Sequence, residues 1–115
     1  MVGARTYIPR RGDLVWLTLN PQSSHEQAGG RPVLTLSPES YNGKTGLAIF
    51  CPVTSQVKGY PFEVHLPEGL PVAGAILSDQ IKNLDWRSRG AELICAAPAA
   101  VVAEVLQKLG TLIAA

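Results

Sequence analysis

The sequence predicts a mainly β domain in which one C-terminal helix covers a small barrel or a strongly bent sheet. Two observations support this. About six short segments show the period of two that is typical of strands, with turn signals between them, and the period becomes helical after Pro98. The chain has 115 residues, 46% of them hydrophobic, which is enough for a single core. We therefore expect residues 1–115 to form one domain.

The predicted strands are bounded by proline, glycine or asparagine. One of them, "LAIFCPV", is almost continuously apolar, as in a strand that is buried on both faces. Another, "YPFEVHL", alternates cleanly, which places Tyr60 and Val64 on one face and Glu63 and His65 on the other. The six predicted strands are 13–19, 32–38, 47–53, 60–66, 74–81 and 91–97.

The C-terminal segment has the spacing of an amphipathic helix. An apolar face extends from Val101 to Ile113, and a polar stripe lies opposite. Pro98 suits the first helical turn, and Glu104 and Lys108 have the order of a stabilising ion pair. We expect Gly110 to interrupt this helix, and we expect the helix to cover the open side of the sheet.

Charge and cysteine content limit the classes of function. The net charge of +1 indicates no global attraction to a long polyanion, so a nucleic acid would be bound over a short footprint. The N-terminus lacks the apolar stretch of a signal peptide, and no run approaches a membrane-spanning length. Cys51 and Cys95 match no zinc motif, so two reduced, buried thiols are expected. We therefore expect a cytoplasmic protein without membrane association.

Three polar clusters lie at strand ends, within 23–31, 52–59 and 78–90. They contain no glycine-rich phosphate loop, no HExxH pattern and no nucleophile elbow, and the two histidines cannot form a metal site without carboxylates. An arginine fork and a hydroxyl are suitable ligands for the non-bridging oxygens of a phosphate. Such groups suit RNA cleavage by the RNA's own 2′-hydroxyl, because the enzyme then supplies no nucleophile, metal or cofactor.

Four blocks of this sequence resemble the MazF/PemK family of toxin endoribonucleases: "EQAGGRPVLTLSP", "YNGKTG", "CPVTSQVKGYPFEV" and "SDQIKNLDWRSRG". Their order and spacing extend the resemblance over most of residues 7–90. The resemblance implies an SH3-like β-barrel, shared with the CcdB-like toxins, that carries a terminal helix and works as a homodimer. It also implies ribosome-independent cleavage of single-stranded RNA at short specific sequences. A cognate MazE-like antitoxin would neutralise this activity.

The resemblance assigns a role to individual residues. The arginine of the family's "RP" turn corresponds to Arg31, the hydroxyl after the third strand to Thr54, and the acid of the loop to Glu26, so these three are the candidate catalytic residues. Arginine is a poor general base, so we assign charge stabilisation to Arg31 and leave proton transfer open. The candidate RNA-binding residues are His25, Gln27, Ser55, Lys58, Gln80, Lys82 and Arg87.

Two positions depart from the family pattern. His25 stands where relatives usually carry serine, and Gly30 stands where close relatives can carry histidine. Neither change touches Arg31 or Thr54, so we expect the departures to alter sequence specificity more than activity.

Other readings of the same residues remain open. The gyrase-targeting toxins share a similar barrel, so a non-enzymatic toxin that binds DNA gyrase is the alternative function, and fold does not fix function. A third possibility is a relative that binds RNA or an antitoxin without cleaving. Glu26 could brace its loop by pairing with Arg31, and Lys58, Lys82 and Arg87 could form a solvated rim rather than phosphate contacts.

Overall fold

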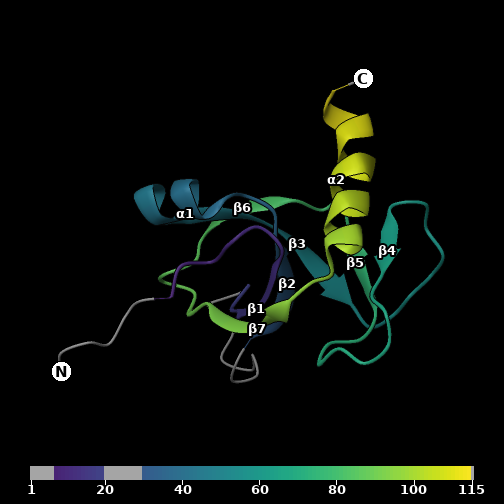
Figure 1. Cartoon of the computed structure of the whole chain (residues 1–115), viewed down its shortest axis with the longest axis horizontal. Coiled ribbons are helices and arrows are strands. Elements are labelled where there is room, and N and C mark those ends of the chain that lie inside the picture. Colours follow the sequence, from purple (N-terminus) through teal and green to yellow (C-terminus); the bar gives the residue numbers. More distant parts are fainter. Residues whose placement is uncertain (1–6, 20–29, 115) are drawn as a thin grey trace.

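Seven strands form one antiparallel sheet in the computed structural model, which describes residues 7–19 and 30–114. The strand order is β4-β5-β3-β2-β1-β7, and β6 pairs with the beginning of β3 (Figure 1). The strands are β1 (Asp13–Leu17), β2 (Arg31–Thr35), β3 (Leu47–Thr54), β4 (Glu63–His65), β5 (Ala75–Leu77), β6 (Lys82–Asp85) and β7 (Glu92–Ala96); the helices are α1 (Glu39–Thr45) and α2 (Ala99–Ile113).

The sheet bends at β3. The early part of this strand pairs with β6, its middle pairs with β2, and its last residues, Val53 and Thr54, pair with β5. Across the described ranges no ladder joins β4 to β7, so the sheet stays open instead of closing into a full barrel. The mainly β fold with a C-terminal helix is thus confirmed, with an open hydrogen-bond ladder.

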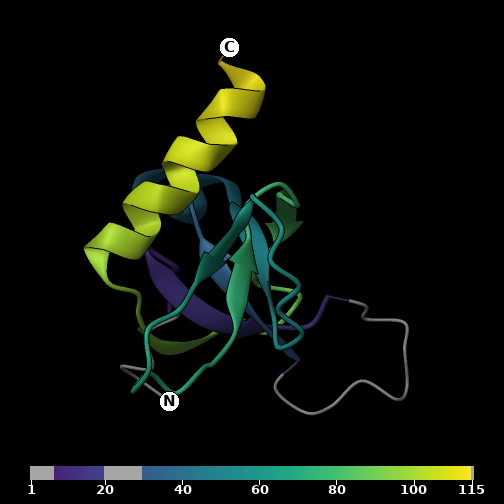
Figure 2. The ribbon, with the colours of Figure 1, turned by 90° about the vertical axis from the view of Figure 1, so that its right-hand side faces the viewer.

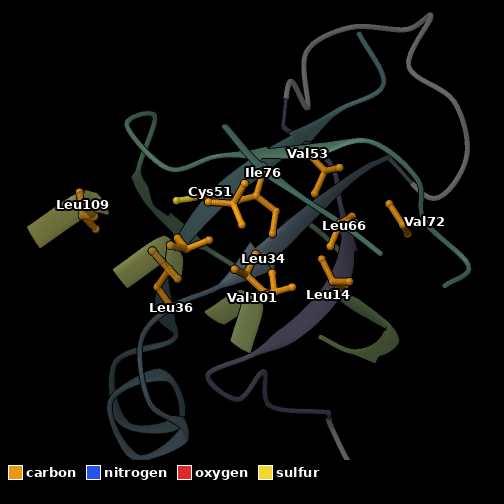
Figure 3. Packing of buried hydrophobic residues seen from close by; sticks show 12 residues of the cluster. Leu14, Leu34, Leu36, Cys51, Val53, Leu66, Val72, Ile76, Val101 and Leu109 are labelled. Carbon is orange, nitrogen blue, oxygen red and sulfur yellow. The ribbon is translucent and has the colours of Figure 1, made fainter. Parts of the chain in front are cut away.

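Alternating side chains of the strands fill two hydrophobic clusters, one on each face of the sheet. The larger cluster includes Leu14, Leu34 and Cys51 and lies between the sheet and α2 (Figure 3). The smaller cluster is on the other face. It contains Val15, Leu17, Val33, Ala48, Phe50 and Trp86. The period of two along β1, β2 and β3 therefore decides which face each residue serves.

Helix α2 packs on the larger cluster through Val101, Val105 and Leu109, and its C-terminal end extends beyond the sheet (Figures 1 and 2). The predicted ion pair between Lys108 and Glu104 is present at 3.7 Å. The predicted interruption at Gly110 is wrong, because the helix continues to Ile113. Its packed apolar face outweighs the cost of one helical glycine, about 1 kcal/mol.

Two elements were not predicted from the sequence. Strand β6 contains mainly exposed polar residues and pairs with β3 along one side. Helix α1 depends on Asn42, whose buried side-chain amide donates to the carbonyls of Pro9 (2.8 Å) and Ser37 (3.0 Å). The indole N–H of Trp86 donates to the carbonyl of Asn42 at 3.0 Å. Tertiary hydrogen bonds therefore stabilise a segment whose own pattern is not helical.

The predicted strand 60–66 is shorter in the structure, where β4 spans Glu63–His65 and Tyr60 lies in a loop, 59% exposed. The alternation of this segment also predicted an exposed Glu63, and this is wrong because Glu63 is 5% exposed. Cys51 and Cys95 are both free, and Cys51 is fully buried, which raises the pKa of its thiol to about 12, but the expected burial of Cys95 is wrong because this residue is only half-buried. Residues 7–19 and 30–114 include no helix with the length and hydropathy needed to cross a membrane.

Candidate functional site

The register between β2 and β3 brings Arg31 and Thr54 to the same level of the sheet. The paired residues are Val33 with Pro52, Leu34 with Cys51, and Thr35 with Phe50. Continuing this antiparallel register by two residues places Arg31 at the level of Thr54. Two groups that lie far apart in the sequence thus lie on neighbouring strands.

Arg31 and Thr54 also lie on the same face. Arg31 pairs with Leu17, and Leu17 belongs to the smaller hydrophobic cluster. Cross-strand partners share a face, and so do residues two apart on one strand, so Phe50 of the same cluster places Thr54 on this face as well. We call the face of the sheet opposite α2 that carries Arg31 and Thr54 the site face.

A glycine lies against the backbone at each of these two positions. Gly30 precedes Arg31 with a φ of +67°, and a Cβ atom there would lie 2.3 Å from the carbonyl oxygen of Leu17. Gly74 has a φ of +123°, and a Cβ atom there would lie 2.0 Å from the carbonyl oxygen of Thr54. Glycine at position 30 therefore has a structural role, because this backbone conformation and this close approach to Leu17 require a residue without a side chain.

The hydroxyl of Thr54 is oriented by the chain that follows it. Its oxygen accepts a hydrogen bond from the backbone N–H of Gln56 at 3.1 Å. A hydroxyl that accepts in this way still has its own hydrogen to donate. Ser55 follows on the surface, and the guanidinium of Arg31 is a fixed positive charge on an exposed residue. The pair can thus offer one short donor and one cationic fork to a phosphate.

An apolar hollow of about 160 Å³ lies on the site face and is lined by residues of β2, β3 and β6. Its lining includes Val33 and Pro52, which are two residues from Arg31 and Thr54 respectively. Gln80 and Lys82 are exposed and contribute polar groups to its wall. The complete lining is Leu19, Val33, Phe50, Pro52, Gln80, Lys82 and Leu84. The structure therefore places Gln80 and Lys82 on the face that carries the catalytic candidates, and it adds Phe50 and Leu84 as apolar lining that the sequence reasoning did not include.

Arg87 lies at the opposite end of β3 from Thr54. It follows Asp85, which pairs with Leu47, and β3 extends roughly 23 Å from Leu47 to Thr54 at about 3.3 Å per residue. The guanidinium of Arg87 lies 4.8 Å from the ring centre of Trp86 and donates to the carbonyl of Gly43 at 3.2 Å. The structure thus does not bring Arg87 together with Arg31 and Thr54.

The turn after β6 is held by Asp85. Its carboxylate accepts the backbone N–H groups of Ser88 and Arg87, each at 3.0 Å. The hydrogen bond from the Ser88 N–H is the largest cause that holds the pKa of Asp85 below its ordinary value. This turn carries Arg89, whose guanidinium donates to the carbonyls of Thr18 (2.9 Å) and Leu19 (2.8 Å). Arg89 therefore supports the end of β1.

His25, Glu26 and Gln27 lie outside the described residues. Lys58 is described and exposed in the loop between β3 and β4, which begins directly after Thr54. Sequence reasoning also missed Glu63, whose buried carboxylate accepts the N–H of Lys58. No period predicts this contact, since the loop folds back onto the strand that follows it.

Comparison with known proteins identifies the family. The family model described as "PemK-like, MazF-like toxin of type II toxin-antitoxin system" matches residues 10–113. The chain belongs to this family.

Curated MazF-like relatives include the endoribonuclease toxin MazF of Escherichia coli strain K12, with 51% identity over 74% of this chain and 76% of that protein. The endoribonuclease PemK of Escherichia coli is 34% identical over 90% of this chain and 80% of that protein.

A crystal structure of MazF from Deinococcus radiodurans superposes with a TM-score of 0.86 and 57% identity, covering 96% of this chain and all of that one. A MazE-MazF structure from the same organism gives a TM-score of 0.83 at 53% identity, covering 94% of this chain and 98% of that one. The bent sheet with its C-terminal helix is therefore the MazF-like fold.

Proposed function

We propose that this MazF-like endoribonuclease toxin cleaves single-stranded RNA at short specific sequences, without a metal ion, by attack of the 2′-hydroxyl on the adjacent phosphate. The observation that carries the proposal is the β2–β3 register, which, continued two residues beyond Val33 and Pro52, brings Arg31 and Thr54 to one level and one face. Both groups can then bind the same phosphate, which is the arrangement this reaction needs. The relatives named as endoribonucleases support the same reaction class.

In the proposed reaction the 2′-oxygen forms a bond to phosphorus while the bond from phosphorus to the 5′-oxygen breaks. The proton of the 2′-hydroxyl leaves, and a proton is delivered to the departing 5′-oxygen. The products are a 2′,3′-cyclic phosphate and a 5′-hydroxyl. Arg31 stabilises the charge that develops on the non-bridging oxygens, and the Thr54 hydroxyl donates a hydrogen bond to one of them. Glu26 is the third proposed catalytic residue, either in direct contact with RNA or bracing its loop by pairing with Arg31, and no group is assigned to proton transfer.

Base recognition would take place on the rest of the site face. A small protein can read single-stranded RNA because its unstacked bases expose their edges and faces. The hollow floored by Phe50 and Leu84 offers an apolar surface to a base, while Gln80 can hydrogen-bond an edge and Lys82 can bind a neighbouring phosphate. Ser55 and Lys58 extend the same surface past Thr54. His25 and Gln27 complete the set of proposed RNA contacts.

The decisive test uses a mixed pool of single-stranded RNA in the presence of EDTA. Cleavage should continue, the 5′ ends should carry hydroxyl groups, and sequencing these ends should give one short consensus. Substrates with a 2′-deoxy nucleotide at the cleavage position should stay intact, and cleavage of such a substrate would reject the proposed nucleophile. DNA supercoiling by gyrase, measured in parallel, should be unaffected by the toxin.

A MazE-like antitoxin is the proposed partner, because relatives of this chain form MazE-MazF complexes. An acidic, disordered tail that folds onto the exposed cations of the site face would cover the RNA-binding surface. Co-purification with an acidic protein encoded beside this chain, together with loss of cleavage, would support the partner. Unchanged cleavage in its presence would count against it.

We further propose that residues 1–115 act as a single domain and that the chain works as a homodimer. Light scattering at micromolar concentration should give twice the mass of 12.2 kDa. A monomer mass together with full activity would overturn the dimer proposal.

A further inference from the structure

The loop between β3 and β4, residues 55–62, leaves Thr54 and crosses the surface with exposed side chains. Ser55 and Lys58 are exposed, as are Val57 (42%) and Tyr60 (59%). Such side chains make little packing contact that could hold a loop in one conformation. The loop must therefore be held through its backbone.

The buried carboxylate of Glu63 makes that connection. One oxygen accepts the backbone N–H of Gly59 at 2.8 Å, and the other accepts the N–H of Lys58 at 3.1 Å. Gly59 has a φ of +84°, so successive N–H groups of the loop turn toward one acceptor, as in the anion-binding turns called nests. The loop thus wraps around an acid supplied by the strand that follows it.

Further hydrogen bonds fix the returning half of the loop. The backbone N–H of Glu63 donates to the carbonyl of Tyr60 at 3.1 Å, and the backbone N–H of Ser78 donates to the carbonyl of Phe62 at 3.0 Å. The Lys108 ammonium of α2 donates to the carbonyl of Pro61. These three hydrogen bonds reach only residues 60–62, whereas the Glu63 carboxylate binds the backbone at Lys58 and Gly59.

Glu63 lies on the same side of the sheet as Thr54. Val53 of β3, Ile76 of β5 and Val64 of β4 form one row across the sheet, and all three belong to the larger cluster under α2. Thr54 and Glu63 each adjoin a member of this row, so their side chains point to the opposite face, the site face. The acid is therefore beneath the loop on the side where RNA would bind.

The environment of Glu63 favours its charged form. Burial alone would raise the pKa of this carboxyl, but the N–H groups of Lys58, Gly59 and Tyr60, with the nearby His65, hold the pKa below its ordinary value. An ionised carboxylate accepts backbone N–H groups more strongly than a neutral group does. Glu63 is thus a permanent acceptor at neutral pH.

We propose that Glu63 is a positioning residue for RNA binding: it holds the backbone at Lys58 and Gly59, so that loop 55–62 presents Ser55 and Lys58 beside Thr54. The inference rests on the proposed function, since it assigns the loop to the substrate of that site. Glu63 does not touch RNA itself. It lowers the cost of binding by ordering the loop in advance.

The first test measures amide hydrogen exchange and needs no activity. In the wild-type protein the amides of Lys58 and Gly59 should exchange slowly. Glu63→Ala should accelerate both, whereas the amide of Ile49, which donates to the hydroxyl of Ser37 far from the loop, should be unchanged. Equal exchange of Lys58 and Gly59 in wild type and Glu63→Ala would overturn the inference.

The second test separates KM from kcat on a short RNA that contains the cleaved sequence. Glu63→Ala should raise KM about tenfold and change kcat by less than about twofold, because the loss falls on binding and not on the reacting groups. Glu63→Gln keeps one carbonyl oxygen of the same reach, so its KM should lie between wild type and Glu63→Ala. This variant also serves if Glu63→Ala does not fold.

Val105→Ala is the control for a loss of stability alone, since Val105 is a fully buried residue of α2 in the larger cluster, on the face of the sheet opposite the site face. This variant should lower Tm and leave KM unchanged. A wild-type KM in Glu63→Ala, or an equal rise of KM in Val105→Ala, would refute the positioning role while the nuclease function stands. Failure of the proposed function is recognised separately, because the wild-type protein would then cleave no RNA. The positioning role would then be refuted together with the proposed function.

Discussion

The start of β2 and the end of β3 supply the two proposed phosphate ligands, and they do so in different ways. At Arg31 only the backbone is fixed, by Gly30 in contact with the carbonyl of Leu17 and by the ladder to β1. At Thr54 the side chain itself is held, through the N–H of Gln56. A guanidinium on a long stem reaches its target from a range of positions, but a hydroxyl one bond from Cβ does not.

The length of a side chain decides how much support a site must build around it. The short ligand is followed by a loop held by Glu63 and flanked by Gly74. Arg31, the long ligand, needs only a fixed strand beneath its backbone and the positive charge of its own guanidinium. We therefore expect Arg31 to be sensitive to its chemistry, and Thr54 to be sensitive to small changes in its surroundings.

The largest effect is expected for Arg31→Ala. Removing the cationic fork should lower kcat by about 10³-fold, the upper range for loss of one charge-stabilising donor. Arg31→Lys should restore only part of this, because an ammonium cannot bind two oxygens in a fixed plane. Single-turnover cleavage of a defined RNA measures both. Cleavage by Arg31→Ala at the parental rate would remove Arg31 from the mechanism.

Thr54→Ala should lower kcat by about 10²-fold, since a neutral donor stabilises the transition state less than a charged one. Thr54→Ser keeps the hydroxyl and the acceptor for Gln56, and should retain most of the activity. The same single-turnover assay compares the two variants. Equal losses in Thr54→Ser and Thr54→Ala would show that the methyl group, rather than the hydroxyl, is required.

Gly74→Ala tests the close approach to the backbone of Thr54. The added Cβ would meet the Thr54 carbonyl oxygen at 2.0 Å, at a φ of +123°. We expect a loss of about 3 kcal/mol in the free energy of unfolding, measured by urea denaturation. Gly69→Ala is the matched control, because Gly69 has a φ of +96° and open space around it, and it should lose only about 1 kcal/mol. Equal losses would mean that the contact with Thr54 has no steric role.

The smallest effect is expected for Lys82→Ala. Removing one phosphate contact should raise KM severalfold and reduce the slope of log K against log salt by about 0.7. Lys44→Ala removes an equal charge from α1 and should change neither quantity. Titration of RNA binding at several salt concentrations measures the slope for each of the two variants. Identical behaviour of the two variants would assign Lys82 to the solvated rim.

Much of the fold could be predicted because its core strands alternate with a clear period. Segments with little apolar content could not be predicted from that signal. Strand β6 has one half-buried apolar residue, Leu84, and gains its structure from pairing with β3. Helix α1 contains Asn42 and Gly43, which are poor helix formers, and it forms because Asn42 binds carbonyls distant in the sequence.

The candidate site could be predicted only through the family resemblance. Composition places Arg31 in a loop cluster and Thr54 at a strand end, and neither pattern states that the two meet. Their shared level and face follow from the register, which is set by pairing across β2 and β3. Glu63 escaped prediction for a related reason. Its alternation correctly places it opposite Val64, but an alternation pattern cannot reveal that a loop returns to cover that face.

The shared register of β2 and β3 also couples toxicity to folding. A displacement of β3 by one residue would turn its entire row of side chains over, so the hydroxyl would emerge beneath α2 while the guanidinium stayed outside. A nascent or partly unfolded chain therefore contains both proposed phosphate ligands but does not hold them on one face, and we expect it not to cleave RNA. The cell that makes this protein is therefore exposed to an active nuclease only after β2 and β3 have paired in the native register.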